Sequence, residues 1–170
     1  MKITLAELNK LDRVEFTRVV GPVFEHSPWI AESTWPQRPF TTVERLHDAL
    51  CKIVRAASPE QKLALIRAHP DLVGRAALAG TLTRESKGEQ TSAGLNALSP
   101  GEIALFQKQN AAYRARFDFP FVICARLNQK DAILASFEKR LQNSPAQEIQ
   151  TALEEIFKIA ELRLRDLTAQ

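Results

Sequence analysis

Three capping-box patterns mark helix starts along this chain, and they constrain its fold more than any other feature. In each pattern a hydroxyl residue is followed three positions later by Glu or Gln, so that each side chain can bond the other residue's backbone N–H. The patterns lie at Thr4–Glu7, Ser58–Gln61 and Ser99–Glu102. Proline follows Ser58 and Ser99 at the first helical position, where its missing N–H costs nothing. The chain is therefore expected to be built from helices.

The spacing of apolar residues extends this prediction over most of the chain. Helices are expected over 4–20, 42–56, 59–68, 84–95, 100–116, 129–142 and 146–167. The strand-like run 119–125 is too short and isolated to imply a sheet. A length of 170 residues is typical of one domain. We therefore predict a single-domain, all-α helical bundle over 1–170, with one long ordered loop between Val20 and Thr41.

Composition and charge exclude several classes of protein. The net charge is +3, from 23 basic and 20 acidic residues that are scattered along the chain, whereas a nucleic-acid-binding domain needs a clustered basic face. No uncharged apolar run approaches the length that spans a membrane. Cys51 and Cys124 both lie among apolar neighbours and are expected to be buried thiols. A cytoplasmic protein that binds neither nucleic acid nor membrane is predicted.

The histidines give no sign of a metal site. His26, His47 and His69 are not spaced four residues apart, and the chain has no Cys-x-x-Cys pair, so no metal ligand is predicted. No glycine-rich phosphate loop is present, and no cofactor is expected. His47 lies on a predicted helix and is expected to be structural. His26 is expected to fasten the irregular loop around it.

His69 differs from the other two histidines because Pro70 follows it. Proline disfavours the α conformation in the residue before it, so His69 is expected at a corner where a helix stops. Its ring then either caps the helix or points at a ligand.

Three other stretches carry candidate polar groups. Ser86, Glu89 and Gln90 share one helical face, which is either a binding surface or a solvated surface. Arg163 lies near the apolar stripe of the last helix, and needs either an anionic partner or a route to water for its charged end. The run 119–125 offers main-chain groups that no helix has used, and such groups can recognise an amide-rich ligand.

Together these stretches resemble one family over nearly the whole chain. The matching motifs are "FEHSPWIAESTW", "RPF", "LIRAHPDLVG", "LTRESKGEQTSAGL", "YRARFDFPFVICA", "RLQNS" and "IAELRL". They resemble the decarboxylases of 2-oxo-4-hydroxy-4-carboxy-5-ureidoimidazoline (OHCU), which complete the conversion of urate to (S)-allantoin. The resemblance implies an all-α homodimer that uses no metal or organic cofactor. It also implies a bacterial cytoplasmic enzyme, because the peroxisomal tail of the eukaryotic members is absent.

The resemblance assigns roles to individual residues. It implies three catalytic residues, which are His69, Glu89 and Arg163. It implies that the substrate is bound by Pro70, Ser86, Gln90 and the main chain of Phe121, Val122, Ile123, Cys124 and Ala125. His69 would protonate the carbanion left by CO2, because the pKa of histidine lies near working pH. Glu89 would orient it, and Arg163 would bind an anionic group of the substrate.

A competing hypothesis is a helical binding module without catalysis. The basic pI of about 9.0 suggests it, but the helices mix both signs of charge. A further alternative concerns Trp35 and Arg38, which either close the loop 20–41 over a pocket or brace it.

Overall fold

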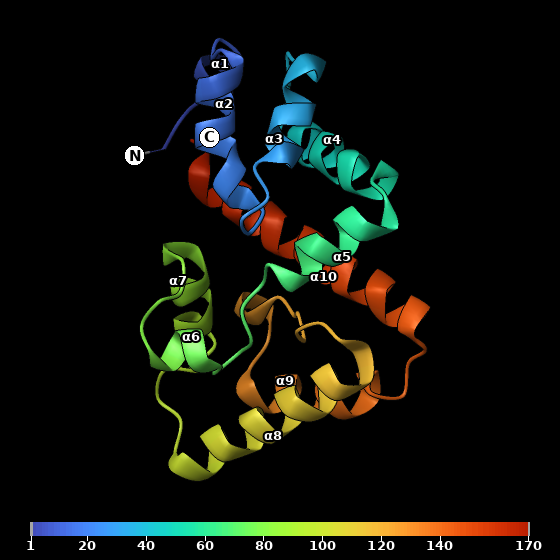
Figure 1. Cartoon of the computed structure of the whole chain (residues 1–170). Helices are drawn as coiled ribbons and strands as arrows, with labels where there is room; N and C mark the ends of the chain where they lie inside the picture. Colours follow the sequence, from blue (N-terminus) through green and yellow to red (C-terminus); the bar gives the residue numbers. More distant parts are fainter. Residues whose placement is uncertain (1, 170) are drawn as a thin grey trace. The chain divides into compact units, whose positions relative to one another are not determined.

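A computed structural model describes residues 2–169, and over this range the chain is all-α, as predicted. Figure 1 shows a ribbon of helices joined by short connections. The α-helices are α1 (Leu5–Leu8), α2 (Arg13–Val20), α3 (Trp29–Thr34), α4 (Val43–Ala56), α5 (Pro59–Arg67), α6 (Arg75–Leu78), α7 (Arg84–Ser92), α8 (Pro100–Phe117), α9 (Lys130–Arg140) and α10 (Pro145–Leu167). Three short 3₁₀ helices are η1 (Gly21–Val23), η2 (Trp35–Gln37) and η3 (Ala125–Leu127). None of the described helices combines the length and apolar character needed to cross a bilayer.

Two of the sequence predictions need correction. The helix predicted over 4–20 is interrupted, because the Asp12 side chain accepts the Glu15 N–H at 2.8 Å and starts α2 as a new helix. The segment 20–41 is not irregular, since η1, α3 and η2 lie within it. Pro22 and Pro36 are the second residues of η1 and η2, and Pro28 is the N-cap of α3. Proline ends one helix but is also favoured at the start of the next. The prolines of this segment were interpreted as helix breakers, and the short helices that they begin were therefore not predicted.

The described chain divides into two compact units. The first comprises the residues up to Ala68 together with those from Phe157 onward, and the second comprises His69–Ile156. The long helix α10 contributes residues to both units. Each unit has its own buried apolar core, and each is described separately below.

In the first unit, the segment 20–41 is braced by two side chains. The Trp35 indole N–H donates to the Leu11 carbonyl at 3.1 Å. The Arg38 guanidinium lies 4.1 Å from the centre of the Trp35 ring and donates to the carbonyls of Asn9 and Leu11 at 2.8 and 2.6 Å. These bonds fasten the segment to the connection between α1 and α2, so Trp35 and Arg38 act as a brace.

In the second unit, aromatic rings fill the space between α8 and α9, which lie side by side (Figure 1). Asp118 ends α8 in the left-handed conformation, with φ of 61°, and turns the chain back toward the helix. Phe121 then stacks on Phe137 of α9, with ring centres 3.8 Å apart, and meets Tyr113 of α8 edge-on. The strand-like run 119–125 is therefore a buried extended segment, and no strand pairs with it among the described residues.

Candidate functional site

His69 lies at the corner that Pro70 predicts. Helix α5 ends at Arg67, two residues earlier, and the His69 side chain is buried, with 6% of the residue exposed. Pro70 is half-buried. A histidine that only capped a surface helix would be more exposed than this. The corner therefore presents a buried imidazole on a rigid turn.

The loop after His69 is held by side chains from α7 and α8. Gln90 of α7 accepts the Val73 N–H at 3.1 Å through Oε1, and its amide nitrogen donates to the Asp71 carbonyl at 3.4 Å. Asn110 of α8 donates to the Leu72 carbonyl at 2.8 Å. Gln90 thus has a structural role that the sequence did not predict, and Asn110 was missed altogether.

Val73 takes an unusual backbone conformation within this loop. Its φ is 54°, in the left-handed region that a β-branched residue rarely adopts. A Cβ added to the next residue, Gly74, would lie 2.7 Å from Asp71 Cβ, so the turn accepts only glycine there. Such strain costs about 1–3 kcal/mol and persists only where neighbouring groups hold the backbone in place. The loop therefore keeps a fixed shape at a cost in stability.

The predicted polar face of α7 is turned toward the protein interior. Thr83 caps the helix by accepting the Ser86 N–H at 3.2 Å. Ser86 and Gln90 are 4% and 6% exposed, and Glu89 is half-buried. The alternative of a solvated face is wrong for these residues. Lys87 is exposed on the other side of the helix.

Helix α7 packs against η3, which begins at the end of the segment 121–125. Cys124, within that segment, donates its backbone N–H to Glu155 Oε2 at 2.8 Å. Burial, followed by the negative charges of Glu155 and Glu89, raises the pKa of the Cys124 thiol to about 11. The effect of Glu89 on this thiol means that the acid of α7 lies near the extended segment. Glu155 was not predicted from the sequence.

The segment carries main-chain groups that have no partner among the described residues. The N–H of Val122 and both the N–H and C=O of Ile123 make no hydrogen bond to any residue between 2 and 169. These two residues are only 4% and 7% exposed. Buried main-chain groups are nearly always paired, so a buried set without protein partners is suited to binding a ligand. Adjacent donors and acceptors of this kind complement amides and ureas.

Arg163 belongs to the first unit, on α10. Only 6% of the residue is exposed, and its Nη1 lies 3.0 Å from Glu25 Oε2 and donates to the Pro22 carbonyl at 3.2 Å. Of the two alternatives for its charged end, an anionic partner or a route to water, the structure shows the anionic partner. The anionic partner that the sequence required is Glu25, which is far from Arg163 along the chain and was missed.

The other two histidines lie in the first unit. His47 Nε2 is 2.8 Å from the Phe157 carbonyl, which confirms its structural role. His26 does not fasten its loop as predicted, because 70% of its side chain is exposed and its φ is 45°. Trp35 and Arg38 hold that segment instead.

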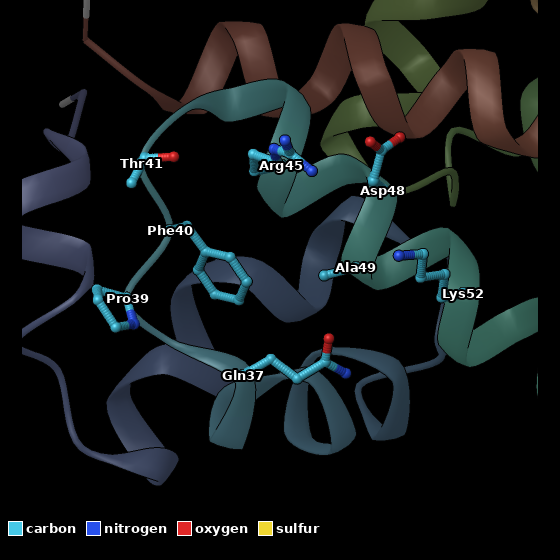
Figure 2. A pocket seen from close by; sticks show the side chains of 8 residues that line it. All are labelled: Gln37, Pro39, Phe40, Thr41, Arg45, Asp48, Ala49 and Lys52. Carbon is cyan, nitrogen blue, oxygen red and sulfur yellow. The ribbon is translucent and has the colours of Figure 1, made fainter.

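A cavity of about 220 Å³ in the first unit is lined by none of the predicted site residues. Figure 2 shows Arg45, Asp48 and Lys52 on α4 and Phe40 on the chain that leads into this helix. The remaining lining residues are Gln37, Pro39, Thr41 and Ala49. Within residues 2–169, no three His, Cys, Asp or Glu side chains gather in a group that could hold a metal ion.

Comparison with known proteins identifies the family. Residues 9–165 match the family described as OHCU decarboxylase. The 2-oxo-4-hydroxy-4-carboxy-5-ureidoimidazoline decarboxylase of Amia calva is 43% identical over 163 residues, which cover 96% of this chain and 93% of that protein. The enzyme of the same name from Haloferax volcanii is also 43% identical, over 97% of this chain and 96% of its own length.

A solved structure agrees with these matches. The crystal structure of an (S)-allantoin synthase superposes with a TM-score of 0.79 at 30% identity. The match covers 98% of this chain, which spans 54% of that chain. The match of the family over residues 9–165 and the full-length relatives lead to one conclusion: the chain belongs to the OHCU decarboxylase family.

Proposed function

We propose that this chain catalyses the decarboxylation of 2-oxo-4-hydroxy-4-carboxy-5-ureidoimidazoline to (S)-allantoin and CO2, a step of urate degradation. The observation that carries the proposal is the match of residues 9–165 to the OHCU decarboxylase family, together with relatives named as decarboxylases of this compound that match over more than nine-tenths of both chains. The proposal covers 1–170 as one functional domain.

The unpaired main-chain groups support a part in substrate binding. The substrate carries a ureido arm and a ring with amide-like groups, which both donate and accept hydrogen bonds. The N–H of Val122 and the N–H and C=O of Ile123, which have no partner among the described residues, complement such a ligand. We assign the segment from Phe121 to Ala125 to this binding, together with Ser86 of α7. Gln90 retains one amide hydrogen beyond its loop contacts for the same purpose.

His69 is proposed as the general acid. When the bond to the carboxylate carbon breaks, CO2 leaves and the electron pair remains on the carbon that bears the hydroxyl group. The ring delocalises that pair onto the adjacent carbon, which bears the ureido arm, as an enolate-like anion. A proton from the imidazolium to one face of that adjacent carbon, while the hydroxyl group passes its proton to the ring nitrogen and becomes the ring carbonyl, then gives a single enantiomer of allantoin. A buried imidazole on a rigid corner, beside Pro70, is suited to delivering the proton from one direction.

Glu89 and Arg163 complete the proposed set. Glu89 is half-buried on α7 and would orient the imidazole or the substrate hydroxyl. Arg163 would make charge-assisted hydrogen bonds to an anionic group of the substrate, for which a guanidinium is well suited. Its assignment rests on the resemblance to the family, and its observed partner is Glu25. A homodimer in a bacterial cytoplasm is part of the same proposal.

The test is optical. The unstable substrate is generated in place from urate by the two preceding enzymes, and circular dichroism follows the allantoin formed with and without this protein. Rapid appearance of one enantiomer is expected. Slow formation of racemic product, at the rate seen without the protein, would overturn the proposal and favour a helical binding module.

A further inference from the structure

A buried ion pair lies next to the segment 121–125 in the second unit. Arg140, near the end of α9, donates from Nε to Glu148 Oε1 at 2.6 Å, and its Nη2 lies 2.5 Å from the same oxygen. Glu148 of α10 is completely buried, and 6% of Arg140 is exposed. Both charges are almost completely shielded from water, so each is stabilised mainly by the other.

Two neutral side chains complete the hydrogen bonding of Glu148. The Tyr113 hydroxyl donates to Oε1 at 2.5 Å, and the Asn143 amide donates to Oε2 at 2.7 Å. The carboxylate therefore accepts bonds from α8, from α9 and from the turn after α9. These contacts fix its position, and through the ion pair they fix the direction of the Arg140 guanidinium.

The far side of the guanidinium holds the extended segment. Arg140 Nη1 donates to the Val122 carbonyl at 2.6 Å, and the guanidinium carbon lies 4.3 Å from the centre of the Phe121 ring. One residue further along, both main-chain groups of Ile123 are without a partner among the described residues. Arg140 is thus hydrogen-bonded to the segment at Val122, immediately before the main-chain groups of Ile123 that are available to a ligand.

Stability alone is a weak reason for such a network. Buried ion pairs lose much of their attraction to desolvation, and well-packed apolar replacements are often as stable or more so. The pair is also imperfect, because Arg140 Nη2 makes no well-directed hydrogen bond to any described residue. Its geometry instead determines where the Val122 carbonyl points, and hence the direction of the next peptide groups.

We propose that Arg140 is a positioning residue that sets the main-chain N–H of Val122 and the N–H and C=O of Ile123 for amide groups of the ligand. Arg140 acts through the segment and does not itself touch the reacting atoms. The inference rests on the proposed function for the identity of the ligand, which is the ureido-imidazolone substrate.

The first test replaces the whole network by apolar residues of similar size, in the triple variant Tyr113→Phe, Arg140→Met, Glu148→Leu. We expect a folded protein whose KM rises by about tenfold, the effect of losing about one well-placed hydrogen bond, with a smaller change in kcat. Ile133→Val, a packing change at a fully buried position of the same helix, is the control and should leave KM unchanged. A folded triple variant with KM within twofold of the wild type would overturn the proposal.

A second variant covers the case in which the triple variant does not fold. Arg140→Lys keeps a positive charge beside Glu148. Its single ammonium group cannot contact Glu148 and the Val122 carbonyl at once as the guanidinium does, so KM should rise by severalfold. Its amide NMR signals give a readout that is independent of activity. The Val122 and Ile123 signals should be single and sharp in the wild type but broadened or doubled in the variant. Unchanged signals would overturn the proposal, whereas altered signals in a protein without decarboxylase activity would contradict only the proposed function.

Discussion

The Arg163 guanidinium lies 3.0 Å from the Glu25 carboxylate, and both side chains are almost completely shielded from solvent. Breaking a buried pair by removing one partner leaves an uncompensated charge in the interior, which costs about 3–5 kcal/mol. The pair lies within the first unit and links α10 to the turn after η1. Its two charges therefore stabilise that unit only as long as both are present.

Replacement of Glu25 by alanine is expected to lower the free energy of unfolding by about 3–5 kcal/mol, because Arg163 would remain buried without its carboxylate. Urea unfolding followed by circular dichroism measures the change. Glu32→Ala is the matched control, since Glu32 pairs with Arg13 at the surface at 3.2 Å and should cost at most about 1 kcal/mol. Equal effects of the two substitutions would contradict the prediction.

Replacement of His69 by asparagine should reduce turnover by at least about 10²-fold, because a positioned general acid contributes about 10²- to 10⁴-fold. The product should also lose its excess of one enantiomer, since protonation by solvent has no preferred face. Both effects are measured in the coupled assay with urate. His47→Asn removes the ring bonded to Phe157 and should leave turnover close to that of the wild type. Normal chirality from the His69 variant would exclude His69 as the acid.

The acid stability of the second unit should depend on Glu102. A hydrogen bond from Lys130, followed by bonds from the backbone and side chain of Ser99, lowers the pKa of this carboxyl from 4.5 to about 2. Because the pKa is lower in the folded chain, the stabilising contribution is complete above about pH 4.5 and is lost as pH falls toward about 2. Glu102→Gln should therefore flatten the fall in stability across this interval.

Urea midpoints between about pH 6 and pH 2.5 measure this effect of Glu102, since they report stability on both sides of the ordinary carboxyl pKa. Lys130→Met removes the largest cause of the lowered Glu102 pKa and leaves the hydrogen bonds from Ser99. The pH dependence of its stability should therefore lie between those of the wild type and Glu102→Gln. Identical curves for the wild type and Glu102→Gln would show that another group controls the acid transition.

Removal of metal ions should leave the reaction rate unchanged. The proposed chemistry assigns the proton transfer to His69 and the binding of the anionic group to Arg163, so no step requires a metal. Turnover is measured before and after dialysis against a chelator, with the two preceding enzymes checked separately under the same conditions. Activity that disappears with the chelator and returns with zinc would refute the prediction.

Local patterns in the sequence were sufficient for most of the helices. The capping boxes at Thr4, Ser58 and Ser99 are all formed, and the predicted helix 146–167 is observed as Pro145–Leu167. These features depend on residues a few positions apart. The short helices α3 and α6 were missed because each has too few turns for a periodic pattern to be visible.

The candidate site was only partly predictable, because its supporting contacts join residues distant in the chain. Helical spacing placed Ser86 and Gln90 on one face, and the structure shows that this face is buried. No spacing rule could pair Glu25 with Arg163, or Arg140 with the Val122 carbonyl. Such pairs arise only when the chain folds, and no local pattern of residues signals them.

The buried thiol of Cys124 has a consequence for how this protein tolerates oxidants. Cysteine reacts with peroxides as the thiolate, and a thiol with a pKa of about 11 is almost entirely protonated at neutral pH. Conversion to a sulfenic acid would add an oxygen atom to a side chain that is 1% exposed, in the middle of the extended segment. Burial of the thiol, reinforced by the carboxylates of Glu155 and Glu89, disfavours the thiolate and therefore makes this part of the protein resistant to oxidation.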